Sequence, residues 1–137
     1  MKDVYQIFDE SFATILRFLE NAQYDNCYKI SSDMTRIASV SEFTDGILVS
    51  EILESVFSQL STLFGSYKID EVGGKLIKDQ LKEQISLLSK NYRIDDKNKV
   101  YPILRDLRSM VTQFQFKCWN TMSEKVEPEF KRIVRRM

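Results

Sequence analysis

The stretch GILVSEILESVFSQLSTLFG at residues 46–65 decides the fold class. Its apolar residues recur at spacings of three and four, which is the period of one face of an α-helix. The stripe comprises Leu48, Ile52, Val56, Leu60 and Leu63, and it is widened by Ile47, Leu53, Phe57 and Phe64. A stripe this wide predicts a nearly buried helix at the centre of the fold, in which Ile52, Val56 and Leu60 are fully buried. Gly65 is the predicted C′ residue that ends it.

Four further segments show the same helical spacing. Their stripes are Val4, Phe8, Phe12, Ile15, Leu19 and Ala22; Cys27, Ile30, Met34 and Ile37; Ile77, Leu81, Ile85, Leu88 and Tyr92; and Val100, Leu104, Leu107, Val111, Phe114 and Cys118. Asp3 and Asp70 are candidate N-caps, residues 95–99 form a polar loop, and Pro128 begins a short last segment. The sequence therefore predicts one all-α domain over residues 1–137: an up-and-down helical bundle of about five helices plus a short C-terminal helix.

The composition agrees with a folded helical domain. The chain has 137 residues with 43% hydrophobic content, and its 4 Gly and 2 Pro are too few for the many turns of an all-β fold. Residues 1–5 are not followed by the uninterrupted apolar region of a signal peptide. No window is expected to reach the ~18 apolar residues of a membrane span. We therefore expect a cytoplasmic protein without a transmembrane segment.

The side-chain inventory restricts the possible chemistry. With no histidine, the chain has neither a Ser-His-Asp or Cys-His catalytic arrangement nor a His-dependent metal motif. Cys27 and Cys118 both fit apolar stripes, so we interpret them as structural residues. No cofactor or metal is expected, and the chain is predicted not to be an enzyme.

One carboxylate pattern leaves a distant alternative open. Glu51 and Glu54 form an ExxE pair on one helix, the spacing with which helical nucleotide hydrolases hold Mg²⁺. The next helix offers Asp79 and Glu83 at i, i+4, mixed with lysines, and this departs from the ExxD spacing of those enzymes. A Mg²⁺-dependent nucleotide hydrolase is thus the least favoured function.

Charge is divided unevenly along the chain. Residues 1–66 carry 4 Lys/Arg and 10 Asp/Glu, whereas residues 67–137 carry 16 Lys/Arg and 10 Asp/Glu, so the halves have formal net charges of −6 and +6. Such asymmetry indicates either complementary faces or an anionic partner for the basic half. Complementary faces would place Asp9, Glu10 and Glu20 near cations of the fourth or fifth helix.

The C-terminal half contains the candidate contact surface. Phe116 and Trp119 lie off the apolar stripe of the helix that contains them, so a partner or the chain's own tail is expected to cover them. The apolar side of the tail, formed by Phe130, Ile133 and Val134, would contribute to the same surface. The favoured function is therefore a non-enzymatic protein–protein interaction module, either a homo-oligomer or a subunit of a larger assembly.

The basic side of the same region supports an alternative. Lys117 sits between the two aromatic residues, and the tail adds Lys131, Arg132, Arg135 and Arg136 on its polar side. Aromatic residues interleaved with cations are typical of single-stranded nucleic-acid binding, and a basic turn contacts phosphates. A nucleic-acid-binding accessory protein is the second hypothesis.

Overall fold

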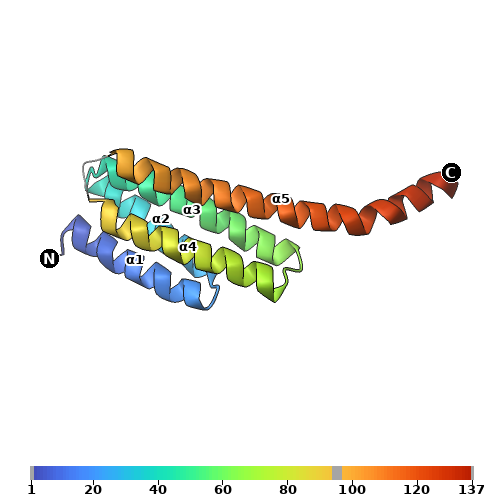
Figure 1. Ribbon diagram of the computed structural model, residues 1–137. Helices are drawn as coiled ribbons and strands as arrows, with labels where there is room; N and C mark the ends of the chain where they lie inside the picture. The colour runs from blue at the N-terminus through green and yellow to red at the C-terminus, as the bar shows by residue number, and fades with distance from the viewer. Residues whose placement is uncertain (1, 94–96, 137) are drawn as a thin grey trace.

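The protein is an all-α helical bundle, as the sequence predicts (Figure 1). The computed structural model describes the backbone of residues 2–93 and 97–136, and the side chains of residues 2–93 and 98–120. Within these ranges the helices are α1 (Val4–Glu20), α2 (Tyr24–Val40), α3 (Thr44–Ser66), α4 (Glu71–Asn91) and α5 (Lys97–Arg136), and there is no strand.

The helices form a closed ring in the order α1, α2, α3, α5, α4. In the described part of the chain, each helix packs against two others, and α3 and α4 are not among the packed pairs although they are consecutive. The reason is that α5 packs against both of them and completes the ring between them. Consequently α3 and α5 run parallel, whereas the other neighbouring pairs are antiparallel.

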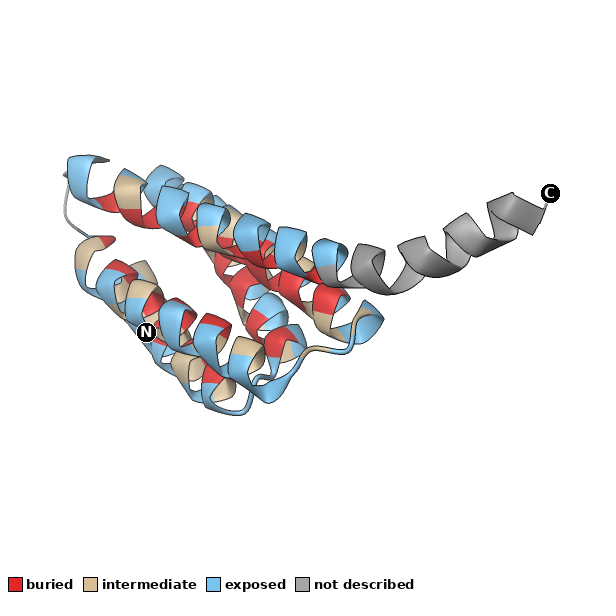
Figure 2. Cartoon of the chain, turned by 45° about the vertical axis from the view of Figure 1, so that its right-hand side comes forward, coloured by how far each residue is buried: buried red, intermediate tan, exposed pale blue. Residues whose placement is uncertain are grey.

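The core lies inside this ring and takes one stripe from every helix, as the inward-facing buried residues in Figure 2 show. The predicted stripes of α4 and α5 are buried throughout, from Ile77 to Tyr92 and from Val100 to Cys118. The largest fully buried side chains are Phe8, Phe12, Phe57, Ile15, Leu19, Met34, Leu53, Leu60, Leu81, Ile85, Leu88 and Leu107.

The prediction for α3 is wrong in two respects. The helix is not central, because it is one member of the ring with neighbours on two sides. Its buried arc includes Val49, Leu53, Val56 and Leu60, while Ile52 is only partly buried and Leu48 is 37% exposed. A helix in a ring buries only the arc that faces the core, so one edge of a wide apolar stripe stays outside.

The composition of α3 also differs from expectation. It is the one helix among the described residues that is long and apolar enough to cross a membrane, with a mean hydropathy of 1.3 over its best window. A core helix of a globular bundle passes the same test, and 39% of that window is buried inside the bundle.

The N-caps are confirmed, but the helix ends differ from prediction. Asp3 accepts a hydrogen bond from the Gln6 amide at 2.8 Å, and Asp70 accepts one from the Gly73 amide at 2.6 Å. Gly65 lies inside α3, which continues to Ser66. The left-handed residues that end helices are instead Ala22 after α1 and Glu42 after α2, with φ of 53° and 56°.

The C-terminal region forms part of α5 and not a separate helix. The helix begins at Lys97, inside the predicted polar loop, and runs to Arg136 through Pro128. A proline removes one backbone hydrogen bond and favours a bend, but it does not have to end a helix.

Candidate interaction surface

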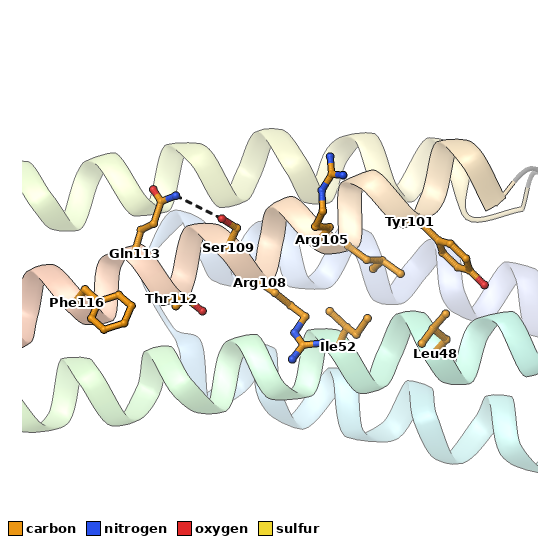
Figure 3. A pocket seen from close by; sticks show the side chains of 10 residues that line it. Leu48, Ile52, Tyr101, Arg105, Arg108, Ser109, Thr112, Gln113 and Phe116 are labelled. Carbon is orange, nitrogen blue, oxygen red and sulfur yellow. Dashed lines mark hydrogen bonds between the residues drawn. The ribbon is translucent and has the colours of Figure 1, made fainter.

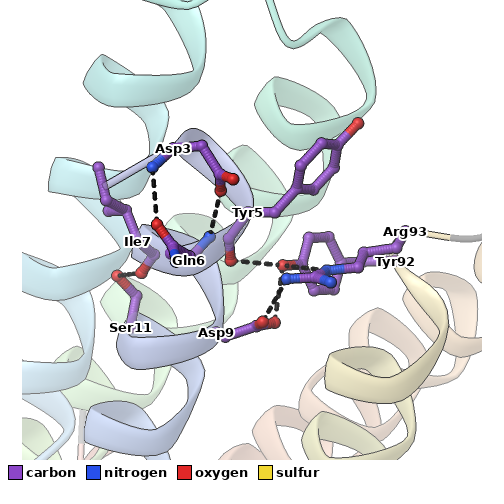
Figure 4. A network of polar contacts seen from close by, with 8 residues as sticks. All are labelled: Asp3, Tyr5, Gln6, Ile7, Asp9, Ser11, Tyr92 and Arg93. Atoms are coloured by element: carbon purple, nitrogen blue, oxygen red, sulfur yellow. Dashed lines mark hydrogen bonds and ion pairs between the residues drawn. The ribbon is translucent and has the colours of Figure 1, made fainter. Parts of the chain in front are cut away.

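Two seams of the ring join a helix of the acidic half to a helix of the basic half: α1 with α4, and α3 with α5. The α1–α4 seam is closed at one end by a polar network (Figure 4). The Tyr92 hydroxyl lies 2.8 Å from the Asp9 carboxylate and 3.0 Å from the Tyr5 carbonyl oxygen. Arg93 pairs with Asp9 and lies 5.2 Å from the centre of the Tyr5 ring. Burial raises the pKa of Tyr92 to about 12.

The other end of this seam is closed by a second ion pair. Lys82 of α4 pairs with Glu20 of α1, and its hydrogen bond and positive charge lower the pKa of that carboxyl. The predicted complementarity of the two halves is therefore confirmed between α1 and α4, at Glu20 and Asp9. Glu10 is the exception, because it pairs with Lys2 of its own half at 2.8 Å.

The α3–α5 seam opens outward as a groove of about 540 Å³ (Figure 3). Its walls are lined by Leu48 and Ile52 of α3, and by Tyr101, Leu104, Arg105, Arg108, Ser109, Thr112, Gln113 and Phe116 of α5. Leu48, Tyr101 and Phe116 are large apolar side chains that remain 37%, 48% and 54% exposed. The groove is thus a mainly apolar surface left open to solvent.

The groove exists because α5 carries two stripes. Its core stripe runs from Val100 to Cys118, and a second stripe at spacings of three and four faces outward. This outward stripe comprises Tyr101, Arg105, Arg108, Thr112, Phe116 and Trp119. On α3, the groove side comprises Leu48, Ile52, Ser55 and Gln59, with the same spacing. Each wall of the groove therefore has a ridge of side chains at the spacing that allows another helix to pack against it.

Phe116 and Trp119 lie together at one end of this outward stripe. Their rings meet edge to face with centroids 5.7 Å apart, and Trp119 is 45% exposed. Both side chains remain about half exposed, so the prediction that they lie outside the core is confirmed. Lys117 between them is also exposed. The side chains of Phe130, Ile133, Val134, Lys131, Arg132, Arg135 and Arg136 lie outside the described residues, so their predicted roles stay predictions.

Sequence reasoning missed part of this surface. The sequence pattern predicts Leu48 and Ile52 in the core and gives no separate role to Tyr101, whereas Leu48 and Tyr101 are exposed and Ile52 is only partly buried. A signal for Tyr101 was present in the second stripe of α5, in register with Phe116 and Trp119. For Leu48 and Ile52 there was no local signal, because both continue an apolar stripe whose exposed edge depends on where α5 packs.

Charges at the groove are not paired across it. Arg105 and Arg108 belong to the lining, which contains no carboxylate. Arg105 contacts Asp106 of its own helix at 3.6 Å, and no ion pair joins Arg108 to any described residue. On α3, Glu51 is exposed next to the groove and likewise makes no ion pair with the described side chains. This seam therefore differs from the α1–α4 seam, where opposite charges meet within the chain.

The other candidate chemistry is not assembled among the described residues. Glu51 and Glu54 lie on α3, whereas Asp79 and Glu83 lie on α4, and α5 separates the two helices. No group of three or more potential metal ligands occurs in residues 2–93 or 98–120. The Cys27 thiol is buried, and burial raises its pKa to about 12, so it is protonated at neutral pH and is a poor nucleophile.

Comparison with known proteins finds no protein family, curated protein or solved structure that matches the chain.

Proposed function

We propose that this protein is a helical protein–protein interaction module and that the α3–α5 groove, together with Phe116 and Trp119, is its contact surface. One observation carries the proposal: two large aromatic rings and an open apolar groove lie along the same outward stripe of one helix. Leaving a Phe-sized side chain in water forgoes ~1.5–3 kcal/mol of burial free energy, so a partner gains affinity by covering these rings.

The chemistry of the surface supports this function. Trp, Phe, Tyr and Arg are enriched at interfaces and at the residues that contribute most to binding. The groove and its extension contain all four types, at Trp119, Phe116, Tyr101, Arg105 and Arg108. A groove between two helices also matches the mode in which an amphipathic helix or helix pair docks through residues at i, i+4 and i+7.

The test is a double substitution with a matched control. Phe116→Ala with Trp119→Ala removes the exposed aromatic pair, and Tyr28→Ala with Leu76→Ala removes two side chains of similar exposure on α2 and α4. Sedimentation of the full chain, alone and with the proteins that co-purify with it, measures complex formation. We expect the first variant to lose the complex while it remains folded, and the control to keep it. If both variants keep the complexes of the wild type, this surface is not the interface.

The same preparations separate the other two hypotheses. Retention on single-stranded DNA that weakens with salt, and that is lost in Lys117→Glu, would favour the nucleic-acid function. A higher melting temperature with Mg²⁺ plus a nucleoside triphosphate would favour the hydrolase. If the protein is an interaction module, neither effect is expected. Its cytoplasmic location stays a prediction.

A further inference from the structure

We infer that the partner in the α3–α5 groove is a second copy of this chain, in a two-fold symmetric dimer in which α5 of each protomer lies on α3 of the other. The inference rests on the proposed function and specifies its partner. Three observations carry it: the parallel register of α3 and α5, the distribution of charge between them, and the size of the surface.

The register is set by a hydrogen bond across the seam. The Gln59 side-chain amide of α3 donates to the Gln115 side-chain oxygen of α5 at 2.7 Å, so these two residues lie at the same level. Both helices run in the same direction from there. At ~1.5 Å per residue, Glu51 lies ~12 Å from this level, while Arg108 and Arg105 lie ~10 Å and ~15 Å from it on the same side. The two arginines therefore bracket the level of Glu51.

In a two-fold symmetric dimer, this register brings the opposite charges together. A two-fold axis parallel to the helices and above the groove keeps every residue at its level and exchanges the two sides. It places α5 of each protomer over α3 of the other. Glu51 of each protomer then lies beside the partner's Arg105 and Arg108, so the dimer contains two copies of this contact. Both charge types are available for this contact, because Glu51 and Arg108 form no ion pair with the described part of their own chain.

The charge pattern also selects this arrangement over the other face-to-face dimer. An axis perpendicular to the helices would lay α5 on the partner's α5 and α3 on its α3. The basic stripe with Arg105 and Arg108 would then meet itself, and like charges held together at an interface oppose binding. With the parallel axis, the apolar residue Leu48 falls within a turn of the partner's Tyr101.

The surface is large enough for a stable dimer. The 23 residues of α3 extend over ~34 Å, and two helices side by side are ~20 Å wide. Their outward face therefore covers ~700 Å² per protomer, close to the ~800 Å² that each partner contributes to a standard interface. Phe116 and Trp119 add the aromatic residues that dominate such contacts, opposite the last turns of the partner's α3.

The test uses charge reversal in trans. Glu51→Arg gives a chain with cations on both sides of this contact, and Arg105→Glu with Arg108→Glu gives one with carboxylates on both sides. All three positions are exposed, so both variants are expected to keep the wild-type circular dichroism and melting transition. Each variant alone should dimerise at least tenfold more weakly than the wild type. Mixed in equal amounts they should form a heterodimer, because both symmetry-related contacts then join opposite charges.

The readout is mass by sedimentation equilibrium, where the wild type should reach twice the 16.1 kDa of one chain. Control variants Asp79→Arg and Lys75→Glu, on exposed positions of α4, should not change that mass. A wild type that stays monomeric at 100 μM (a concentration chosen as roughly 100-fold above a ~1 μM Kd), or a mixture that does not recover the dimer, overturns the inference. A monomer that binds another protein, and loses it in the Phe116 and Trp119 variant, overturns the dimer alone and leaves the proposed function standing.

Discussion

The two seams between the acidic and basic halves contain the same kinds of charged residues, but these residues pair across only one of the two seams. Along α1–α4, Asp9 meets Arg93 and Glu20 meets Lys82, and the Tyr92 hydroxyl completes the network. Along α3–α5, Glu51 and Arg108 remain without an intramolecular ion pair in the described part, beside an open apolar groove. The difference indicates that charge complementarity is satisfied within the chain at the first seam and is left for a partner at the second.

The largest expected effect distinguishes the core side of α3 from its groove side. Leu53 is fully buried, so Leu53→Ala should lower the free energy of unfolding by ~2–5 kcal/mol through lost burial and a cavity. Ile52 is next to it in sequence but only partly buried in the groove wall, so Ile52→Ala should cost less than half as much. Urea denaturation at a concentration where the chain is monomeric measures both.

Equal losses in that pair would show that the α3–α5 seam is as tightly packed as the core. The comparison between a closed and an open seam would then fail. Self-association of the two variants can be compared under conditions where both remain folded. A dimer that is weakened by Ile52→Ala and not by Leu53→Ala would support an open seam at α3–α5.

The next effect tests the closed seam. Tyr92→Phe removes the hydroxyl between Asp9 and the Tyr5 carbonyl, and should lower the free energy of unfolding by ~1–2 kcal/mol. The folded-state pKa of Tyr92 is raised to about 12, so the neutral hydroxyl stabilises the fold fully below pH 10, and this contribution is lost as pH rises through 12. Between pH 9 and pH 12, the free energy of unfolding should therefore fall less steeply with pH for Tyr92→Phe than for the wild type.

Self-association is the control for that variant. Tyr92 lies on the seam away from the groove, so the mass of the protein should not change. A Tyr92→Phe protein that is as stable as the wild type at neutral pH would mean that the hydroxyl makes no net contribution and that the seam is closed by packing alone.

The smallest expected effect concerns the exposed ion pair at the other end of α1–α4. The pKa of Glu20 is lowered by the hydrogen bond with Lys82 and by its charge, so the ionised carboxylate stabilises the fold. This contribution is present above the ordinary Glu value of 4.5 and is lost as pH falls through the lowered folded-state pKa. Glu20→Gln should remove it, and high salt should weaken it, because the pair is open to solvent.

Stability measured between pH 3 and pH 6 checks this last prediction. The difference between the wild type and Glu20→Gln should be greatest at pH 6 and shrink toward pH 3. A difference that is constant over this range, or that grows on acidification, would show that the Glu20–Lys82 contact does not stabilise the folded chain.

The sequence alone determined the all-helical class, most of the helices and most of their inward faces, because these depend on local spacing. The stripes Ile77 to Tyr92 and Val100 to Cys118 are buried as periodicity predicts, and Asp3 and Asp70 cap their helices. The exposure of Phe116 and Trp119 also followed locally, since both lie off the core stripe of a helix whose period fixes their direction.

Tertiary structure decided which helices are neighbours, and with them the site. Nothing in the spacing of α3 indicates that α5 packs between α3 and α4, yet this placement exposes Leu48, makes Ile52 a groove wall and separates the carboxylates of α3 from those of α4. The packing of α4 on α1 likewise brings Arg93 to Asp9, although the two residues are far apart in the sequence. Periodicity states how wide an apolar face is, whereas the arc of that face that meets the core is set by long-range packing, whose free energy depends on all five helices together.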